Sequence, residues 1–464
     1  RSLSRGFMLG RLCVTKNLIR IRPSAITLKW QIEFMKSDSL TKMVVHNKSL
    51  LFKKVRDNIL FFVLSKGVAF LAPIFFLNFV SLEEYGVVEF SYALGSVLAV
   101  VAMLGLGGAY PYFVLRRGER DKKQVFMLYG VPVLGIAVIA CLLRWYGAIG
   151  QRFSLILLFT LIFALQRLYS SILKSEDKGW LGVLFDGGYY FILTGVILII
   201  WSVGITHHVM LLEAAMQVYL FVLGGFYVRQ FYKLHTKSIL ALLHDDCGEI
   251  LRYSLHMVVS GIIIYWLTSS ARIYIAYFMG YEQVGIYSFY FRLAGIAIII
   301  HQFLYIAFFQ KLYMGNSRRL DLYYTAIMGL VLCGCLACYL FVPLLSRYFL
   351  KGLSIDNARL FFLIALQMPL WVGISLCEGL VGRENQIRQM NLRVIVPVML
   401  LPVALYLLQG RLTIELFTLL NAVTFTIALA IQHRLLSRRG IKLRKCSILS
   451  LALFAASIVI YFTV

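Results

Sequence analysis

Charged residues are scarce in this chain. Of its 464 residues only 14% are charged, whereas 60% are hydrophobic and the mean hydropathy is +0.81. A water-soluble domain could not hide so much apolar surface in one core. The sequence also lacks any polar stretch between its apolar runs that is long enough for a soluble domain. These absences exclude a soluble globular protein and predict a polytopic membrane protein.

Motifs for ATP, metal and covalent chemistry are absent too. No GxxxxGK[ST] phosphate-binding loop occurs, so we do not expect this chain to hydrolyse ATP. Its His and Cys residues show no metal-ligand spacing, and no Ser, His and carboxylate share one stretch as a candidate triad. We therefore predict no metal site, no catalytic residues, no enzyme activity and no bound cofactor.

Acidic residues are also few, 21 against 46 basic ones, which leaves a formal net charge of +25. In a soluble protein this excess would suggest a nucleic-acid partner, but here the positions of the charges decide. Basic residues gather before the first apolar run and after every even-numbered one. By the positive-inside rule the amino terminus is predicted to be cytoplasmic, and no nucleic-acid partner is expected.

What the chain has instead is long apolar runs. A helix needs about 20 apolar residues to cross a membrane, and thirteen stretches approach or exceed that length, from 59–80 to 447–464. The predicted fold class is an all-α polytopic membrane protein with two six-helix bundles. Twelve transmembrane helices form the bundles, and the last stretch is a possible thirteenth that either crosses the membrane or lies along its surface.

A short pattern occurs twice, as FVSLEEYGVVEFSYAL from Phe79 and as FMGYEQVGIYSFYFRL from Phe278. Aligned without a gap, Glu83 falls on Glu282 and Gly86 falls on Gly285. Each copy lies between two long apolar runs, so the pattern indicates an internal duplication. Duplicated halves are a recurring construction in transporters, whose two bundles rock around a site between them.

These observations divide the chain into five segments. They are a basic cytoplasmic segment (1–56), the first six-helix bundle (57–232), a cytoplasmic linker (233–250), the second six-helix bundle (251–435), and a basic segment with the extra helix (436–464). The first segment could be read as a transit peptide. We favour the interpretation that translation starts at Met35 or Met43 and that the earlier residues lie upstream.

Four basic residues fall inside predicted spans, where a charge costs a few kcal/mol and is a functional candidate by default. They are Lys66, Arg167, Arg272 and Arg292. Helical spacing places each on a face with polar or small residues, such as Arg167 with Ser170 and Ser171. Such faces are predicted to line an interior cavity, and several cations there suit an anionic cargo, with Arg favoured for phosphate.

Five carboxylates fall in or near the spans: Glu89, Asp186, Glu213, Glu378 and Glu415. One hypothesis makes some of them H+ or Na+ coupling sites. The other makes them structural partners of the four cations, and we prefer it for any single carboxylate because buried charges are normally paired.

Pro73, Pro369 and the Pro397/Pro402 pair are candidate bending points in an alternating-access cycle.

The run DNILFFVLSKGVAFLAPIFFLNFVSLEEYGVVEFSYALGSVLAVVAMLGLGGAYPYFVLRR, from Asp57 to Arg117, resembles a known family. It is similar to the O-antigen flippase and polysaccharide export proteins of the multidrug/oligosaccharidyl-lipid/polysaccharide exporter superfamily. SSARIYIAYFMGYEQVGIYSFYFRLAG from Ser269 and the turns LKSEDK and VGRENQ extend the resemblance over about 57–435. Unlike the family pattern, Ala271 rather than an acid precedes Arg272, which weakens any coupling role there.

The resemblance implies a flippase in the bacterial cytoplasmic (inner) membrane. Its cargo would be an undecaprenyl-pyrophosphate-linked oligosaccharide, the repeat unit of O-antigen or another surface polysaccharide, and lipid, a polysaccharide polymerase and a chain-length regulator would be its partners. The alternatives are a multidrug or cation-coupled exporter of the same superfamily and a membrane glycan polymerase. An exporter of cations should prefer a carboxylate-rich cavity, and a polymerase usually has a larger outer loop than this chain offers.

Overall fold

The computed structural model describes residues 60–119, 122–176, 178–234, 247–349, 357–384 and 386–463. The chain forms two units, Arg1–Asn58 and Ile59–Val464, and the described residues belong to the second. The predicted segment 1–56 and most of the predicted linker 233–250 lie outside the described residues. Within those residues every regular element is helical.

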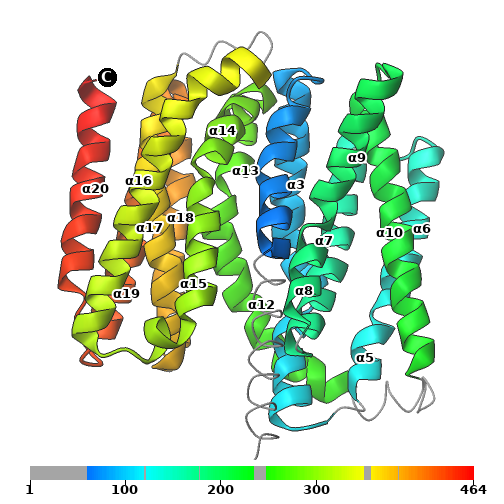
Figure 1. Ribbon diagram of the computed structural model, residues 1–464, viewed down its shortest axis with the longest axis horizontal. Coiled ribbons are helices and arrows are strands. Elements are labelled where there is room, and N and C mark those ends of the chain that lie inside the picture. Colours follow the sequence, from blue (N-terminus) through cyan, green and yellow to red (C-terminus); the bar gives the residue numbers. More distant parts are fainter. Residues whose placement is uncertain are drawn as a thin grey trace, which may run out of the picture. The chain divides into compact units, whose positions relative to one another are not determined.

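The helices follow one another through the second unit with short breaks (Figure 1). In chain order they are an unlabelled helix Leu60–Phe76, α3 Leu82–Ala102, α4 Leu106–Tyr110, the π-helix η1 Pro111–Arg116, α5 Lys123–Leu128, α6 Gly130–Trp145, α7 Gln151–Ser175, α8 Gly179–Asp186, α9 Gly188–Val203, α10 His208–Lys233, α12 Cys247–Ser269, α13 Ala271–Met279, α14 Tyr281–Ala294, α15 Ile296–Met314, α16 Ser317–Phe349, α17 Ala358–Arg383, α18 Ile387–Leu407, the 3-10 helix η4 Gln409–Arg411, α19 Ile414–Ser437 and α20 Arg444–Thr463.

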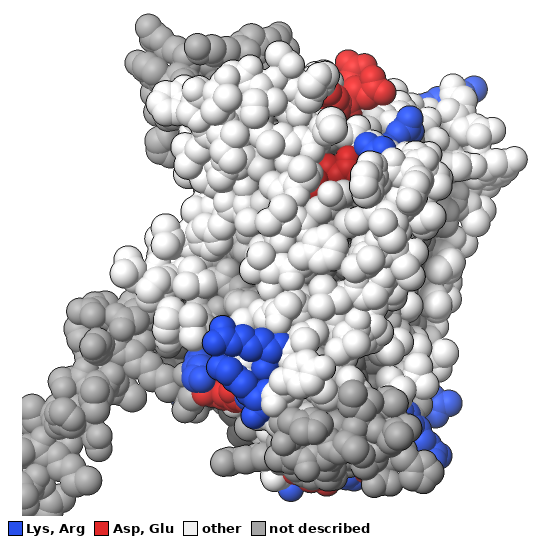
Figure 2. Space-filling model, turned by 90° about the vertical axis from the view of Figure 1, so that its right-hand side faces the viewer, with Lys and Arg blue, Asp and Glu red and all other residues white. Residues whose placement is uncertain are grey.

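Nine of the helices in the described ranges are long and apolar enough to cross a membrane, and three bent pairs raise the number to 12. The apolar helix Leu60–Phe76 is shorter. On the face drawn in Figure 2, charged side chains gather near the two ends and a broad uncharged band lies between them. A band of this kind is what a hydrocarbon layer requires of the surface that it covers. The predicted class of all-α polytopic membrane protein is confirmed.

Three of the candidate spans are bent at short breaks. The bends are 51° between α8 and α9 at Gly187, 53° between α12 and α13 at Ser270, and 41° between α14 and α15 at Gly295. Pro369 stands inside α17, and Pro397 and Pro402 inside α18, without ending either helix. None of the three breaks is at Pro73, Pro369, Pro397 or Pro402, and bending at those prolines during a transport cycle stays a prediction.

Helix α3 begins with a complete capping box. The Ser81 hydroxyl accepts the backbone N–H of Glu84 at 3.2 Å, and the Glu84 carboxylate accepts the backbone N–H of Ser81 at 2.9 Å. Glu83 and Glu84 also place negative charge at the positive end of the helix dipole. This cap determines where helix α3 starts within the first copy of the repeated pattern.

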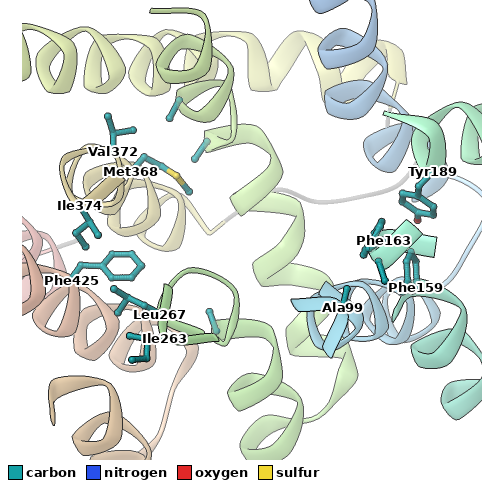
Figure 3. Packing of buried hydrophobic residues seen from close by; sticks show 14 of the residues in the cluster. Ala99, Phe159, Phe163, Tyr189, Ile263, Leu267, Met368, Val372, Ile374 and Phe425 are labelled. Carbon is teal, nitrogen blue, oxygen red and sulfur yellow. The ribbon is translucent and has the colours of Figure 1, made fainter. Parts of the chain in front are cut away.

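Apolar side chains pack in both parts of the helical unit. Figure 3 shows one group around Phe159, Phe163 and Tyr189, on α7 and α9, and another around Met368 and Phe425, on α17 and α19. Helix α3 packs against α7 on one side and against α14 on the other. It is therefore the main contact between the N-terminal and C-terminal helices.

The two copies of the repeated pattern meet at this contact. A Cβ atom on Gly86 of α3 would overlap the carbonyl oxygen of Tyr281, and one on Gly285 of α14 would overlap that of Leu82. Leu82 aligns with Tyr281 in the gapless alignment, so the two overlaps are equivalent positions of a local two-fold relation. Small residues allow membrane helices to approach this closely. The duplication thus produces a close crossing of α3 and α14 at the end of the helix bundle that we predict to face the outside of the cell.

The possible thirteenth helix, α20, packs against α16, α17 and α19, and Figure 1 shows it running beside α16. Asp321 of α16 caps its first turn by accepting the backbone N–H groups of Lys445 and Cys446, each at 3.0 Å. A carboxylate there satisfies donors that have no partner within the helix. Helix α20 is therefore fixed along the other helices and has the composition of a span.

Candidate functional site

The four cations that we singled out line a single cavity of about 330 Å³. Lys66 comes from the helix Leu60–Phe76, Arg167 from α7, Arg272 from α13 and Arg292 from α14. The wall therefore combines residues from both repeats. Ala69 and Gly295, which helical spacing placed beside Lys66 and Arg292, line the same cavity, and the bend at Ser270 lies two residues before Arg272.

A second cavity of about 670 Å³ adjoins the first and shares with it Lys66, Arg167 and Asp186. It extends to Lys174 and Ser175 at the end of α7, which we predict to be cytoplasmic. Lys174 binds Asp186 at 2.6 Å. The cationic chamber, as we call the two cavities together, thus continues from the arginines toward the predicted cytoplasmic face.

Glu89 of α3 binds two of the cations. Its carboxylate lies 2.9 Å from Nη2 of Arg292 and 3.2 Å from Nε of Arg272. The side chains are deeply buried, with 4% of Glu89, 6% of Arg272 and 13% of Arg292 exposed. Arg272 also donates to the Ser288 hydroxyl at 2.9 Å. One carboxylate from the first repeat therefore holds two arginines of the second.

Lys66 and Arg167 differ from the other two cations. Among the residues that the structure describes, no carboxylate lies within ion-pair distance of either. Arg167 instead donates to the carbonyl of Ser96 at 2.9 Å and stacks its guanidinium 4.4 Å from the ring centre of Tyr265. Because a buried charge without a counter-ion is costly, these two positions suit an anion that comes and goes.

Aromatic residues that we did not predict complete the wall. The hydroxyls of Tyr92 and Tyr190 lie 2.9 Å apart, and Arg292 donates to Tyr190 at 3.2 Å while facing the Tyr92 ring at 5.1 Å. The sequence could have predicted Tyr92, because Glu89, Tyr92 and Ser96 follow at helical spacing and therefore share one face of α3. Tyr190 belongs to a largely apolar helix and carries no comparable signal.

Of the remaining predicted carboxylates, Asp186 lines the chamber and binds Lys174, and the other three lie outside the chamber. Glu213 binds Arg144 at 2.8 Å, and Glu415 accepts a hydrogen bond from Asn357 at 2.6 Å. Glu378 lines neither cavity of the chamber, and in the described helices no cation lies within ion-pair distance of it. Our preferred pairing with the intramembrane cations therefore describes Glu89 alone, because Asp186 and Glu213 bind other basic residues.

At the predicted cytoplasmic end a separate cluster joins the N-terminal helices to α12. Glu249 lies 2.5 Å from Nη1 of Arg117 and 2.6 Å from Nζ of Lys122. Beside them the rings of Tyr112 and Tyr253 stack with their centres 4.2 Å apart. Hydrogen bonds from Lys122 and Arg117 hold the pKa of Glu249 below its usual value. We call this group the inner clamp.

We expect Glu249→Gln to loosen the inner clamp. A lowered pKa means that the carboxylate stabilises the clamp above its usual pKa and that this contribution is lost as the pH falls through the lowered value. At neutral pH the variant should therefore show faster hydrogen exchange than the wild type at the start of α12. Glu282→Gln, an exposed acid in the first turn of α14, is the control. Equal exchange in Glu249→Gln and the wild type would contradict the prediction.

Comparison with known proteins adds little to this geometry. No protein-family model and no curated protein matches the chain. Among solved structures it matches the crystal structure of the eukaryotic MATE transporter AtDTX14 with a TM-score of 0.40 and 13% sequence identity, covering 88% of this chain and 99% of that one. A likeness of this degree says nothing about the function of this chain.

Proposed function

We propose that this protein is a flippase that moves a lipid-linked, phosphate-bearing oligosaccharide across the bacterial cytoplasmic membrane. The observation that carries the proposal is that Lys66, Arg167, Arg272 and Arg292, from both repeats, line one cavity. An undecaprenyl-pyrophosphate-linked repeat unit of O-antigen or another surface polysaccharide has the required anionic head. A polymerase and a chain-length regulator would then act on the exported product.

The charges of the chamber favour an anion as cargo. Five basic side chains, the four cations and Lys174, line the two cavities together with the carboxylate Asp186, and Glu89 binds Arg272 and Arg292 without lining either cavity. Charge-assisted hydrogen bonds from arginine to phosphate are among the strongest that side chains make. The alternative of a multidrug or cation exporter would require the opposite balance, because a cationic compound would face like charges.

The arrangement of the charges suggests how binding could drive the cycle. A pyrophosphate entering from the Lys174 end would first meet Lys66 and Arg167, which have no described carboxylate within ion-pair distance. It would then compete with Glu89 for Arg272 and Arg292. Glu89 lies one turn from Gly86 on α3, whereas Arg272 and Arg292 lie on α13 and α14. Breaking the ion pairs between Glu89 and these arginines would therefore weaken the contact between the two repeats at the crossing of α3 and α14. The lipid tail would stay in the bilayer.

Coupling to H+ or Na+ stays a separate part of the proposal. Glu378 and Glu415 stand apart from the cationic chamber, and Asp186 and Glu213 are each bound by a basic residue. An ion that binds at Glu213, Glu378 or Glu415 would act on the helices, whereas an ion at Asp186 would lie in the chamber itself. An anionic cargo in the chamber is compatible with either ion.

The proposal is tested by reconstituting the purified protein into vesicles. We expect transbilayer movement of a fluorescent undecaprenyl-pyrophosphate-linked oligosaccharide, measured by loss of fluorescence to a membrane-impermeant quencher. A neutral lipid carrying the same sugar without phosphate is the control and should move at the rate of protein-free vesicles. Uptake of a cationic dye with no movement of the pyrophosphate lipid would refute the proposal and favour the multidrug alternative.

A further inference from the structure

A groove of about 520 Å³ runs between α18 and α19, away from the cationic chamber. Its α18 side is formed by Leu392, Val396 and Leu400, which follow one another at intervals of four residues. These side chains are 65%, 54% and 58% exposed. Helical spacing by four places them on one face, so the groove has an apolar wall open to the outside of the helix bundle, where acyl chains would be.

One end of the groove is strongly basic. Arg393 of α18 and Arg434 and Arg438 at the end of α19 line it there. On α19, Ile427 and Ile431 precede the two arginines on the same face. Within the described ranges no carboxylate lies within ion-pair distance of any of the three arginines. Three uncompensated guanidinium groups therefore stand at the predicted cytoplasmic end of an apolar channel.

We propose that this groove is a binding site for one anionic phospholipid of the cytoplasmic leaflet. An acyl chain would lie along Val396, Leu400 and Ile427, and the phosphate would bind the arginines at the end. Basic pockets between membrane helices on the cytoplasmic side are suited to such head groups. The apolar wall and the three arginines together favour an anionic lipid over other occupants. Free phosphate would leave the apolar wall without a partner, and a zwitterionic lipid would bring an ammonium group toward three cations.

This site is independent of the proposed transport function. It is built from α18 and α19 and includes none of the four cations of the chamber. Helix α19 packs against α17 and α18, so a bound lipid would support the C-terminal helices at their predicted cytoplasmic end. A protein that fails to move any oligosaccharide could still bind this lipid, and the two proposals can fail separately.

The test measures lipid binding to the detergent-purified protein by native mass spectrometry, with phosphatidylglycerol and phosphatidylcholine as probes. We expect retained phosphatidylglycerol and about tenfold weaker binding in Arg434→Ala/Arg438→Ala, the loss of roughly 1.4 kcal/mol. Both side chains are exposed, so the variant should fold. Arg388→Ala is the matched control, because it removes an exposed arginine in the first turn of α18 that does not line the groove.

A second variant, Val396→Trp, fills the groove and leaves all three arginines in place. It should also lose phosphatidylglycerol, which distinguishes a lipid site from simple attraction between charges. Equal binding of the two lipids, or unchanged phosphatidylglycerol binding in the double arginine variant, would overturn the proposal. Displacement of phosphatidylglycerol by undecaprenyl phosphate at equal concentration would overturn it as well, because the groove would then belong to the carrier lipid.

Discussion

The double variant Lys66→Ala/Arg167→Ala is expected to stop transport of the pyrophosphate-linked oligosaccharide. These two cations have no described carboxylate partner, so the cargo phosphate is the group that would satisfy them. Each hydrogen bond to a charged group contributes about 1.5–3 kcal/mol, and losing two should slow translocation by roughly a hundredfold or more. The measurement is the initial rate in reconstituted vesicles, at matched protein content.

Three further variants show whether charge in the chamber is the cause. Arg167→Lys keeps the charge without the planar fork and should retain part of the rate. Arg411→Ala removes an exposed arginine of η4 that lies outside the chamber and should transport normally. Glu89→Gln should tighten binding of the anion, because the competing carboxylate is gone, although two buried arginines then destabilise the empty protein. Normal transport in the double variant would rule out the cargo site.

Replacing Gly86 or Gly285 by Ala is expected to force α3 and α14 apart. The new Cβ atom would overlap the backbone carbonyl of Tyr281 or Leu82, and neither backbone group can rotate away as a side chain would. Overpacking of this kind costs about 1–3 kcal/mol or more. The melting temperature in detergent should therefore fall.

Gly135→Ala is the control for this substitution. Gly135 lies inside α6, and a Cβ atom there would meet nothing within 4 Å. Since Ala favours a helix more than Gly does, the variant should be as stable as the wild type or slightly more stable. If Gly86→Ala and Gly285→Ala melt at the same temperature as Gly135→Ala, the repeats do not cross closely at these glycines.

Much of the architecture follows from local sequence. Apolar runs of span length predict the helices because every residue contributes independently to the cost of leaving water. Helical spacing also placed Arg167 and Arg272 on polar faces, and the repeated pattern with Gly86 and Gly285 marked equivalent positions in two halves. The division at 57–232 and 251–435 stays a prediction, as do the coupling roles of the carboxylates.

What only the tertiary structure decided is which charges meet. Glu89 and Arg292 are separated by 203 residues, and their contact depends on how α3 and α14 cross. The sequence offers five carboxylates with similar surroundings, and no local pattern indicates that Glu89 alone would bind the arginines. In the same way the bends at Gly187 and Ser270 depend on packing, because a proline permits a kink but neighbouring helices determine whether one forms. Composition and periodicity are properties of short segments, whereas ion pairs and cavities are properties of the assembled helices.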